Sequence, residues 1–296
     1  MITAFCNRLG IRLEQNVSLK EHTTFRIGGN ADYAVYPTNT LQMSEIIRFF
    51  NENNVRYFVL GRGSDLLASD HGFRGVLVMT RQLNQLIREG NRIVAGAGCS
   101  MAAVSNFAQK EGLAGLEFLH GIPGSIGGGV FMNAGAYGSE MASFVTSVEW
   151  VDEQGSIHRF DGDQMDFSYR HSYFSDHNGI ICSAEFSCEA GDSSQIRAIT
   201  TELDRRRREK QPLEYPSAGS AFKRPEGYFA GKLIEDAGLK GFSVGGAQVS
   251  EKHAGFIVNK GGATARDVKD LMQHVINTVQ TQFGVTLEPE IRFLDE

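Results

Sequence analysis

Cysteine is scarce in this sequence, and its four copies show no spacing typical of a metal or redox site. No two of them form a Cys-x-x-Cys pair, which excludes the common zinc and thioredoxin-like motifs. Cys182 and Cys188 are expected along one strand, where about 3.3 Å per residue separates them by roughly 20 Å, too far for a disulfide. We therefore predict reduced, buried thiols. The histidines are equally scattered, so no metal site is expected.

Long apolar runs and an excess of positive charge are also missing. Runs such as Gly75–Met79 and Ala254–Val258 are far too short to cross a bilayer. The first residues lack the basic and then apolar pattern of a secretory signal. The net charge of -6 argues against a general nucleic-acid binder, which needs a basic surface. We therefore expect a cytoplasmic protein that binds neither membrane nor nucleic acid.

Repeats and low-complexity segments are absent as well, and apolar periodicity predicts a series of packed elements. Strands are predicted at residues 31–37, 56–60, 75–80, 92–97, 144–152, 156–160, 179–187, 255–260 and 289–294. Helices are predicted at residues 40–53, 100–111, 192–210, 228–237 and 264–283. The strands 144–152 and 156–160 should form a hairpin, and Ser100 should cap a helix. Pro212 and Pro216 then interrupt the pattern, which favours a domain boundary nearby.

Glycine, by contrast, is abundant, with 34 residues where about 21 would be average. One cluster, residues 61–67, follows the predicted strand 56–60. Its bare amides and its serine hydroxyl suit a pyrophosphate. It is no dinucleotide-binding fingerprint, because Leu66 replaces the third glycine, and it is no Walker loop, because no Gly-Lys-Ser/Thr follows. A simple tight turn stays the alternative.

The second cluster spans residues 121–138, and the neighbours of its glycines are apolar. An apolar wall lined with glycine suits a large flat cofactor that the backbone must touch. The alternative is a glycine-rich loop that crosses another element. Ser220, Arg170 and Glu290 are unremarkable by themselves: the serine has no triad partner in view, and lone charged residues are usually solvated.

Taken together, the motifs resemble the UDP-N-acetylenolpyruvoylglucosamine reductases over nearly the whole chain. They lie at residues 23–29, 61–67, 121–138, 169–172, 219–223, 230–241, 253–259 and 288–290. The resemblance implies an α+β fold, with a two-lobed FAD-binding domain of the vanillyl-alcohol-oxidase type and a smaller α+β substrate-binding domain. The implied boundaries are 1–75 with 286–296 for the first FAD lobe, 76–205 for the second and 206–285 for the substrate domain. Residues 187–210 leave no room for the extra tyrosine-bearing loop of one form of the family, which indicates the shorter form.

The resemblance also implies the site residues. Arg170, Ser220 and Glu290 would be catalytic, and Tyr137, Lys210 and Lys223 would contact the substrate. The residues that would hold FAD without a covalent bond are Gly61, Arg62, Gly63, Ser64, Asp65, Leu66, Gly121, Ile122, Pro123, Gly124, Ser125, Gly128, Asn133, Ala134 and Gly135. Asp65 departs from the family, which usually has asparagine there.

The implied reaction is the reduction of the enolpyruvyl group of a UDP-sugar for peptidoglycan synthesis. NADPH would reduce FAD, which would pass hydride to C3 of UDP-N-acetylglucosamine enolpyruvate. Arg170 would stabilise the charge that develops, Ser220 would protonate C2, and Glu290 would act as a neutral donor or as an orienting group. The product would be UDP-N-acetylmuramate, made by a monomer. An oxygen-using FAD oxidase of the same fold and a non-catalytic binding module are the alternatives.

Overall fold

Two units divide the chain, and each collects segments that are distant in sequence. The computed structural model describes residues 1–295, so Glu296, which the sequence assigns to the first FAD lobe, lies outside the described residues. Unit 1 comprises Met1–Gln15, Tyr33–Arg62 and Gly75–Arg206, and the described part of unit 2 comprises Asn16–Asp32, Gly63–Arg74 and residues 207–295. The division after Arg206 lies next to the predicted boundary at 205/206. The two early segments of unit 2 were not predicted to group with the C-terminal one.

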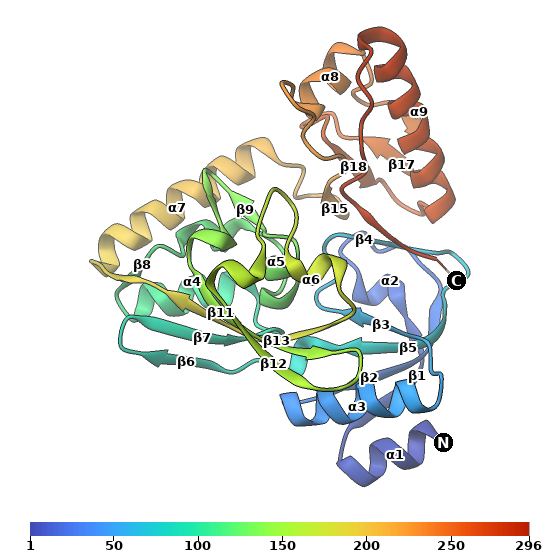
Figure 1. Ribbon diagram of the computed structural model, residues 1–296. Coiled ribbons are helices and arrows are strands. Elements are labelled where there is room, and N and C mark those ends of the chain that lie inside the picture. The colour runs from blue at the N-terminus through green and yellow to red at the C-terminus, as the bar shows by residue number, and fades with distance from the viewer. Residues whose placement is uncertain (296) are drawn as a thin grey trace. The chain divides into compact units, whose positions relative to one another are not determined.

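The structure has a helix at each place where the sequence predicts one (Figure 1). The helices are α1 (Ile2–Leu9), α2 (Leu19–His22), α3 (Thr40–Glu52), α4 (Met101–Lys110), α5 (Ile126–Phe131), α6 (Tyr173–Asp176), α7 (Ser193–Lys210), α8 (Ala230–Asp236) and α9 (Ala265–Phe283). The five predicted helices are confirmed as α3, α4, α7, α8 and α9, with bounds shifted by two residues or fewer. The Ser100 cap is also confirmed, because its hydroxyl accepts from the amide of Ala103 at 3.1 Å. Helix α5, inside the second glycine cluster, was not predicted.

The strands form three larger sheets and three short pairs. Their orders are β1 (Arg12–Ser18), β2 (Asn30–Tyr36), β5 (Phe73–Met79), β3 (Tyr57–Leu60); then β12 (Ile157–Asp161), β11 (Val145–Asp152), β13 (Gly179–Ser187), β7 (Arg92–Gly96), β6 (Leu86–Glu89); then β15 (Ser217–Ser220), β18 (Phe256–Asn259), β17 (Ala247–Val249), β16 (Ser243–Val244). The pairs are β4 (Leu66–Ala68) with β19 (Arg292–Leu294), β8 (Leu113–Ala114) with β14 (Glu189–Ala190), and β9 (Gly135–Ala136) with β10 (Ser139–Glu140).

In unit 1, the five-stranded antiparallel sheet and the helices α1, α3, α4, α5 and α6 contribute to a large apolar core. The predicted hairpin is confirmed, since β11 pairs antiparallel with β12. Five of the eight residues of β11 are buried, and α3 buries the apolar face that its period predicts, including Met43, Ile46, Ile47 and Phe50. These residues belong to one buried cluster, to which β5 and β7 also contribute and against which β3 packs. The candidate site is built from the segments that follow these three strands.

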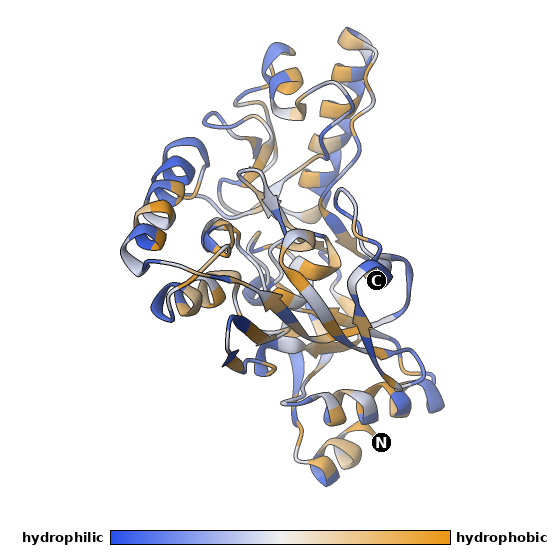
Figure 2. Cartoon of the chain, turned by 60° about the vertical axis from the view of Figure 1, so that its left-hand side comes forward, coloured by the Kyte–Doolittle hydropathy of each residue, from blue (hydrophilic) through white to orange (hydrophobic). Residues whose placement is uncertain are grey.

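Unit 2 has its own core, between the β15–β18–β17–β16 sheet and α8 and α9. Figure 2 shows the apolar stripe along α9, and the buried residues of that stripe are Val268, Leu271, Met272, Val275 and Val279. Thr264 and Asp267 form a capping box at the start of this helix. The last strand is shorter than predicted and begins at Arg292, because Pro289 instead makes an isolated bridge with Phe222. Within residues 1–295, no helix has the length and hydrophobicity that a bilayer crossing requires.

The thiol prediction is confirmed, since all four cysteines are free and buried. Burial raises the pKa of Cys99 and Cys188 to about 11 and that of Cys182 to about 12. At pH 8 these thiols therefore stay protonated and shielded. We expect a chromogenic disulfide reagent to label none of the four in the folded protein and all four after unfolding in guanidinium. Rapid labelling of any thiol in the folded protein would contradict this packing.

Candidate active site

The first glycine loop starts at Gly61, directly after β3, and comes close to Ser125. A Cβ atom added at Gly61 would lie 2.4 Å from the Ser125 hydroxyl oxygen, so a larger residue fits only if this contact shifts. Both residues belong to unit 1. The structure therefore brings the start of the first predicted FAD loop to the residue that precedes α5 in the second.

Two arginines lie at the same loop. The parallel pairing of β3 with β5 sets Leu60 opposite Met79, and Arg81 Nε donates to the carbonyl oxygen of Gly61 at 3.2 Å. Burial, and then the nearby charge of Arg62, lower the pKa of Arg81 below its ordinary value. A guanidinium nevertheless stays charged at neutral pH. Arg62 was predicted in the cofactor set, but no motif points to Arg81, because its position follows from strand pairing.

Helix α5 contains three successive glycines, and two of them lie close to other side chains. A Cβ atom at Gly127 would lie 2.9 Å from the Cβ of Ala97, and one at Gly129 would meet the Cε atom of Met141. A side chain at Gly127 would overlap Ala97, whereas one at Gly129 would require the flexible end of Met141 to move. The helix is therefore pressed against the residues that follow β7.

The remaining glycine, Gly128, faces open space. Only the Ser125 hydroxyl oxygen would come within 4 Å of a Cβ there, at 3.7 Å, and Gly128 is exposed. Ser125 is buried at the N-cap position, yet its side chain makes no capping hydrogen bond. Bare backbone and a serine hydroxyl on one side of α5 fit a flat ligand that lies against the main chain. Of the three helix glycines, only Gly128 was predicted to contact FAD.

The second half of the first loop, from Gly63 onward, belongs to unit 2. Gly63 has a φ of 62°, and a Cβ atom there would lie 2.3 Å from the carbonyl oxygen of His22. The Gly63 carbonyl accepts from the Thr24 amide at 2.9 Å, and the Asp65 carbonyl accepts from the Arg292 amide at 3.1 Å. The backbone of this half-loop is thus fixed from both sides, at a spacing that only glycine allows at residue 63.

The other predicted cofactor residues lie on these same segments. Ser64 is half-buried and Leu66 starts β4 in unit 2, whereas Gly121, Ile122, Pro123, Gly124, Ala134 and Gly135 flank α5 in unit 1. Asn133 is fully buried, and its carboxamide bonds to the main chain of Ser168 and Ala142. Its side chain is therefore already engaged by the protein, and contacts of residues 133–135 with FAD would come from their backbone.

Arg170 occupies the tip of a tight turn in unit 1. The turn runs from Ser168 to His171, which exchange main-chain hydrogen bonds at 3.1 and 3.2 Å. Arg170 has a φ of 56°, a left-handed conformation that L residues rarely adopt. Its guanidinium carbon lies 5.0 Å from the centre of the Tyr169 ring. Such a constrained, half-buried arginine is unusual for a merely solvated charge.

Ser220 and Glu290 are brought together in unit 2. The Glu290 amide donates to the Ala221 carbonyl at 3.0 Å, and the Lys223 amide donates to the Glu288 carbonyl at 2.9 Å. Gly219, with a φ of 78°, lies at the irregular register between β15 and β18 just before Ser220. A bulge of this kind re-aims the next side chain. The two predicted catalytic residues of unit 2 therefore sit on neighbouring segments.

The predicted substrate residues lie at three separate places. Tyr137 is at the tip of the β9–β10 hairpin, and its hydroxyl donates to the Leu203 carbonyl at 3.3 Å, within unit 1. Lys210 ends α7 and is exposed. Lys223 pairs with Glu288 at 3.4 Å. Their substrate contacts stay predictions.

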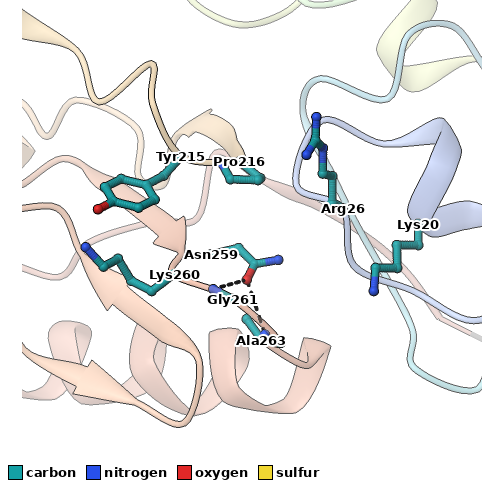
Figure 3. A pocket seen from close by; sticks show the side chains of 9 residues that line it. Lys20, Arg26, Tyr215, Pro216, Asn259, Lys260, Gly261 and Ala263 are labelled. Atoms are coloured by element: carbon teal, nitrogen blue, oxygen red, sulfur yellow. Dashed lines mark hydrogen bonds between the residues drawn. The ribbon is translucent and has the colours of Figure 1, made fainter.

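A pocket of about 280 Å³ in unit 2 was not predicted (Figure 3). It lies between Lys20 and Arg26 on one side and Tyr215, Pro216 and Lys260 on the other. The Lys260 ammonium lies 3.9 Å from the centre of the Tyr215 ring. Because β15 runs antiparallel to β18, the pocket adjoins the end of β15 opposite Ser220. Its walls come from distant segments, so no local motif could have revealed it.

The open face at Gly128 yields a test of the cofactor site. Gly128→Ala adds a methyl group where the protein leaves space, and alanine favours helix by about 1 kcal/mol over glycine. We expect the apo-protein to keep or raise its melting temperature while its dissociation constant for FAD rises at least about tenfold. Flavin fluorescence titration and calorimetry measure the two quantities.

Gly127→Ala is the matched control, since its methyl group would press on Ala97 instead. This variant should lose stability in the absence of FAD. If both variants changed stability and FAD affinity alike, the assignment of the open face to the cofactor would be wrong.

Comparison with known proteins agrees with the predicted family. Residues 31–161 match a family model described as FAD binding domain, and residues 211–294 match the C-terminal domain of UDP-N-acetylenolpyruvoylglucosamine reductase. Curated reductases of this name from Clostridium novyi and Caldanaerobacter subterraneus are each 47% identical over 96% of this chain, covering 92% and 94% of their own length. The crystal structure of the reductase from Thermus caldophilus aligns with a TM-score of 0.83 at 34% identity, over 96% of this chain and 100% of that one.

The predicted α+β fold with a FAD-binding domain and a smaller C-terminal domain is thereby confirmed. The identity of 47% extends over 284 residues of this chain. The chain belongs to the UDP-N-acetylenolpyruvoylglucosamine reductase family of FAD enzymes.

Proposed function

We propose that this protein uses NADPH and bound FAD to reduce UDP-N-acetylglucosamine enolpyruvate to UDP-N-acetylmuramate in the cytoplasm, as a monomer. The observation that carries the proposal is the main-chain pairing of the Ser220 segment with the Glu290 segment, in a chain of this family. An FAD site alone would serve many oxidoreductases. In this proposal, a serine hydroxyl and a carboxylate on two segments joined by main-chain hydrogen bonds supply the groups that protonation of a reduced enol ether needs.

The residues present fit FAD. Gly128 leaves space at the backbone, and Arg62 and Arg81 supply positive charge beside Gly61, as a diphosphate requires. When bound there, FAD would supply the hydride that is added to C3 of the substrate.

The chain's own residues would handle the charge and the proton. As negative charge develops at C2 and on the substrate carboxylate, the permanent charge of Arg170 would stabilise it. The Ser220 hydroxyl would donate the proton to C2, because the developing carbanion is a strong base. We assign Glu290 to orienting Ser220, since its main chain is bonded next to that residue. Tyr137, Lys210 and Lys223 would bind the UDP-sugar.

Replacing Ser220 separates the two half-reactions. Ser220→Ala should leave flavin reduction by NADPH within about twofold of the parent, but slow flavin reoxidation by the enolpyruvyl sugar by about 10²–10⁴-fold, because only the second step needs the proton donor. Stopped-flow absorbance of the flavin band measures both rates.

Ser217→Ala, on the same strand β15, is the control and should change neither rate. Equal losses of both half-reactions in Ser220→Ala would rule out the proton-donor role. Rapid reoxidation of the reduced parent enzyme by oxygen, with no response to the sugar, would instead indicate the oxidase.

A further inference from the structure

The turn that presents Arg170 is strained and must be held from outside. Arg170 stands at the third position of the turn with a φ of 56°, where glycine or asparagine is the usual choice. Within the turn, two main-chain hydrogen bonds join Ser168 and His171. A strained conformation of this kind persists only where the surroundings fix it.

Two buried side-chain hydrogen bonds tie both ends of the turn to the C-terminal end of α5. Asn133 Nδ2 donates to the carbonyl oxygen of Ser168 at 2.9 Å, and Ser172 Oγ donates to the carbonyl oxygen of Phe131 at 2.8 Å. Asn133 and Ser172 are both 0% exposed. Residues on either side of Arg170 are thus anchored to the same short segment, at Phe131 and at Asn133.

The orientation of the Asn133 carboxamide is fixed as well. Its Oδ1 accepts from the Ala142 amide at 3.0 Å while its Nδ2 donates to Ser168. Exchanging the two atoms would leave an oxygen facing a carbonyl, so only one orientation satisfies both partners. Asn133 also has a φ of 43°, which asparagine tolerates better than most residues.

The other end of α5 is anchored where the cofactor is proposed to bind. The Ile126 amide donates to the Cys99 carbonyl and the Gly127 amide to the Ala97 carbonyl, both at 2.9 Å. Ser125, just before the helix, touches the first glycine loop. One helix of six residues therefore joins the candidate cofactor loop to the arginine turn, all within unit 1.

We propose that Asn133 and Ser172 are positioning residues that fix the Arg170 guanidinium relative to the cofactor loop. The proposal rests on the proposed role of Arg170 as the group that stabilises charge on the substrate. It gives the Asn133 side chain a task different from the FAD contact that the sequence predicts. A misplacement of about 1 Å at a catalytic group can lower the rate by about 10²-fold, so two buried bonds that set this position matter to turnover.

The variants are chosen to remove the anchors without forcing the backbone. Ser172→Ala deletes one hydroxyl, and Ser172→Thr keeps it. Asn133→Gly deletes the carboxamide but still allows the positive φ. The matched control is Ser44→Ala, because Ser44 is also buried in unit 1 and its hydroxyl also donates to a main-chain oxygen, that of Gly155.

The readout is the pair of half-reactions of the FAD-loaded enzyme. Ser172→Ala and Asn133→Gly should slow flavin reoxidation by the enolpyruvyl sugar at least about tenfold, with reduction by NADPH within about twofold of the parent. Ser172→Thr should restore reoxidation, and Ser44→Ala should leave both rates unchanged even where it lowers the melting temperature. If Asn133→Gly does not fold, the Ser172 pair still decides. Equal losses in both half-reactions would overturn the proposal.

A double-mutant cycle separates this proposal from the proposed function itself. Residues that act through Arg170 should add no further loss of reoxidation once Arg170→Ala is present, because coupled effects are not additive. Losses that multiply in the double variant would overturn the positioning role. If Arg170→Ala alone left reoxidation unchanged, the role of Arg170 would fail instead, and it would fail whatever the anchors do.

Discussion

The close packing of α5 against the residues after β7 is the constraint on which the candidate site depends. A side chain at Gly127 would overlap Ala97, so the helix can lie this close to Ala97 because residue 127 is glycine. Glycine is a poor helix former, and its cost here is offset by packing and by hydrogen bonds to fixed main-chain carbonyls. A helix so short and so tightly held is a rigid support.

Helix α5 supports two parts of the candidate site in unit 1, one at each end of the helix. Its start lies beside the first glycine loop, and its end carries the residues bonded to the Arg170 turn. Under the proposed function, the glycine loop holds FAD and Arg170 stabilises charge on the substrate, so the two need a fixed mutual position. Because one short helix contacts both, few residues set that position, and these residues tolerate little substitution.

In unit 2, main-chain hydrogen bonds hold the segments of the two candidate catalytic residues in place. Ser220 and Glu290 are far apart in sequence, yet the strand-like contact between their segments sets the spacing through backbone hydrogen bonds. The irregular register at Gly219 breaks the regular alternation of β15 just before the serine. Backbone hydrogen bonds of this kind do not depend on side-chain identity. The side chains of Ser220 and Glu290 are therefore not needed to hold the two segments together.

Periodic elements could be predicted from the sequence, because long apolar stripes such as that of α9 are local signals. Helix α5 could not be, because three glycines in six residues oppose helix locally and only tertiary contacts stabilise it. Arg81 and the pocket beside Tyr215 could not be predicted for another reason. Strand pairing places Arg81 at the loop, and segments distant in sequence form the pocket. Arg170, Ser220 and Glu290 were reached only through the family resemblance, since each is ordinary by itself.

Charge illustrates how far composition can mislead about a site. The chain is acidic overall, which argues against a polyanion spread over its surface. Yet Arg62 and Arg81 lie close enough beside Gly61 that their repulsion contributes to lowering the pKa of Arg81. Like charges that are held together near bare backbone amides are relieved by a compact anion, and the diphosphate of FAD is one. A net negative protein can therefore bind a negatively charged cofactor, because over a few ångströms the local arrangement of charge outweighs the total.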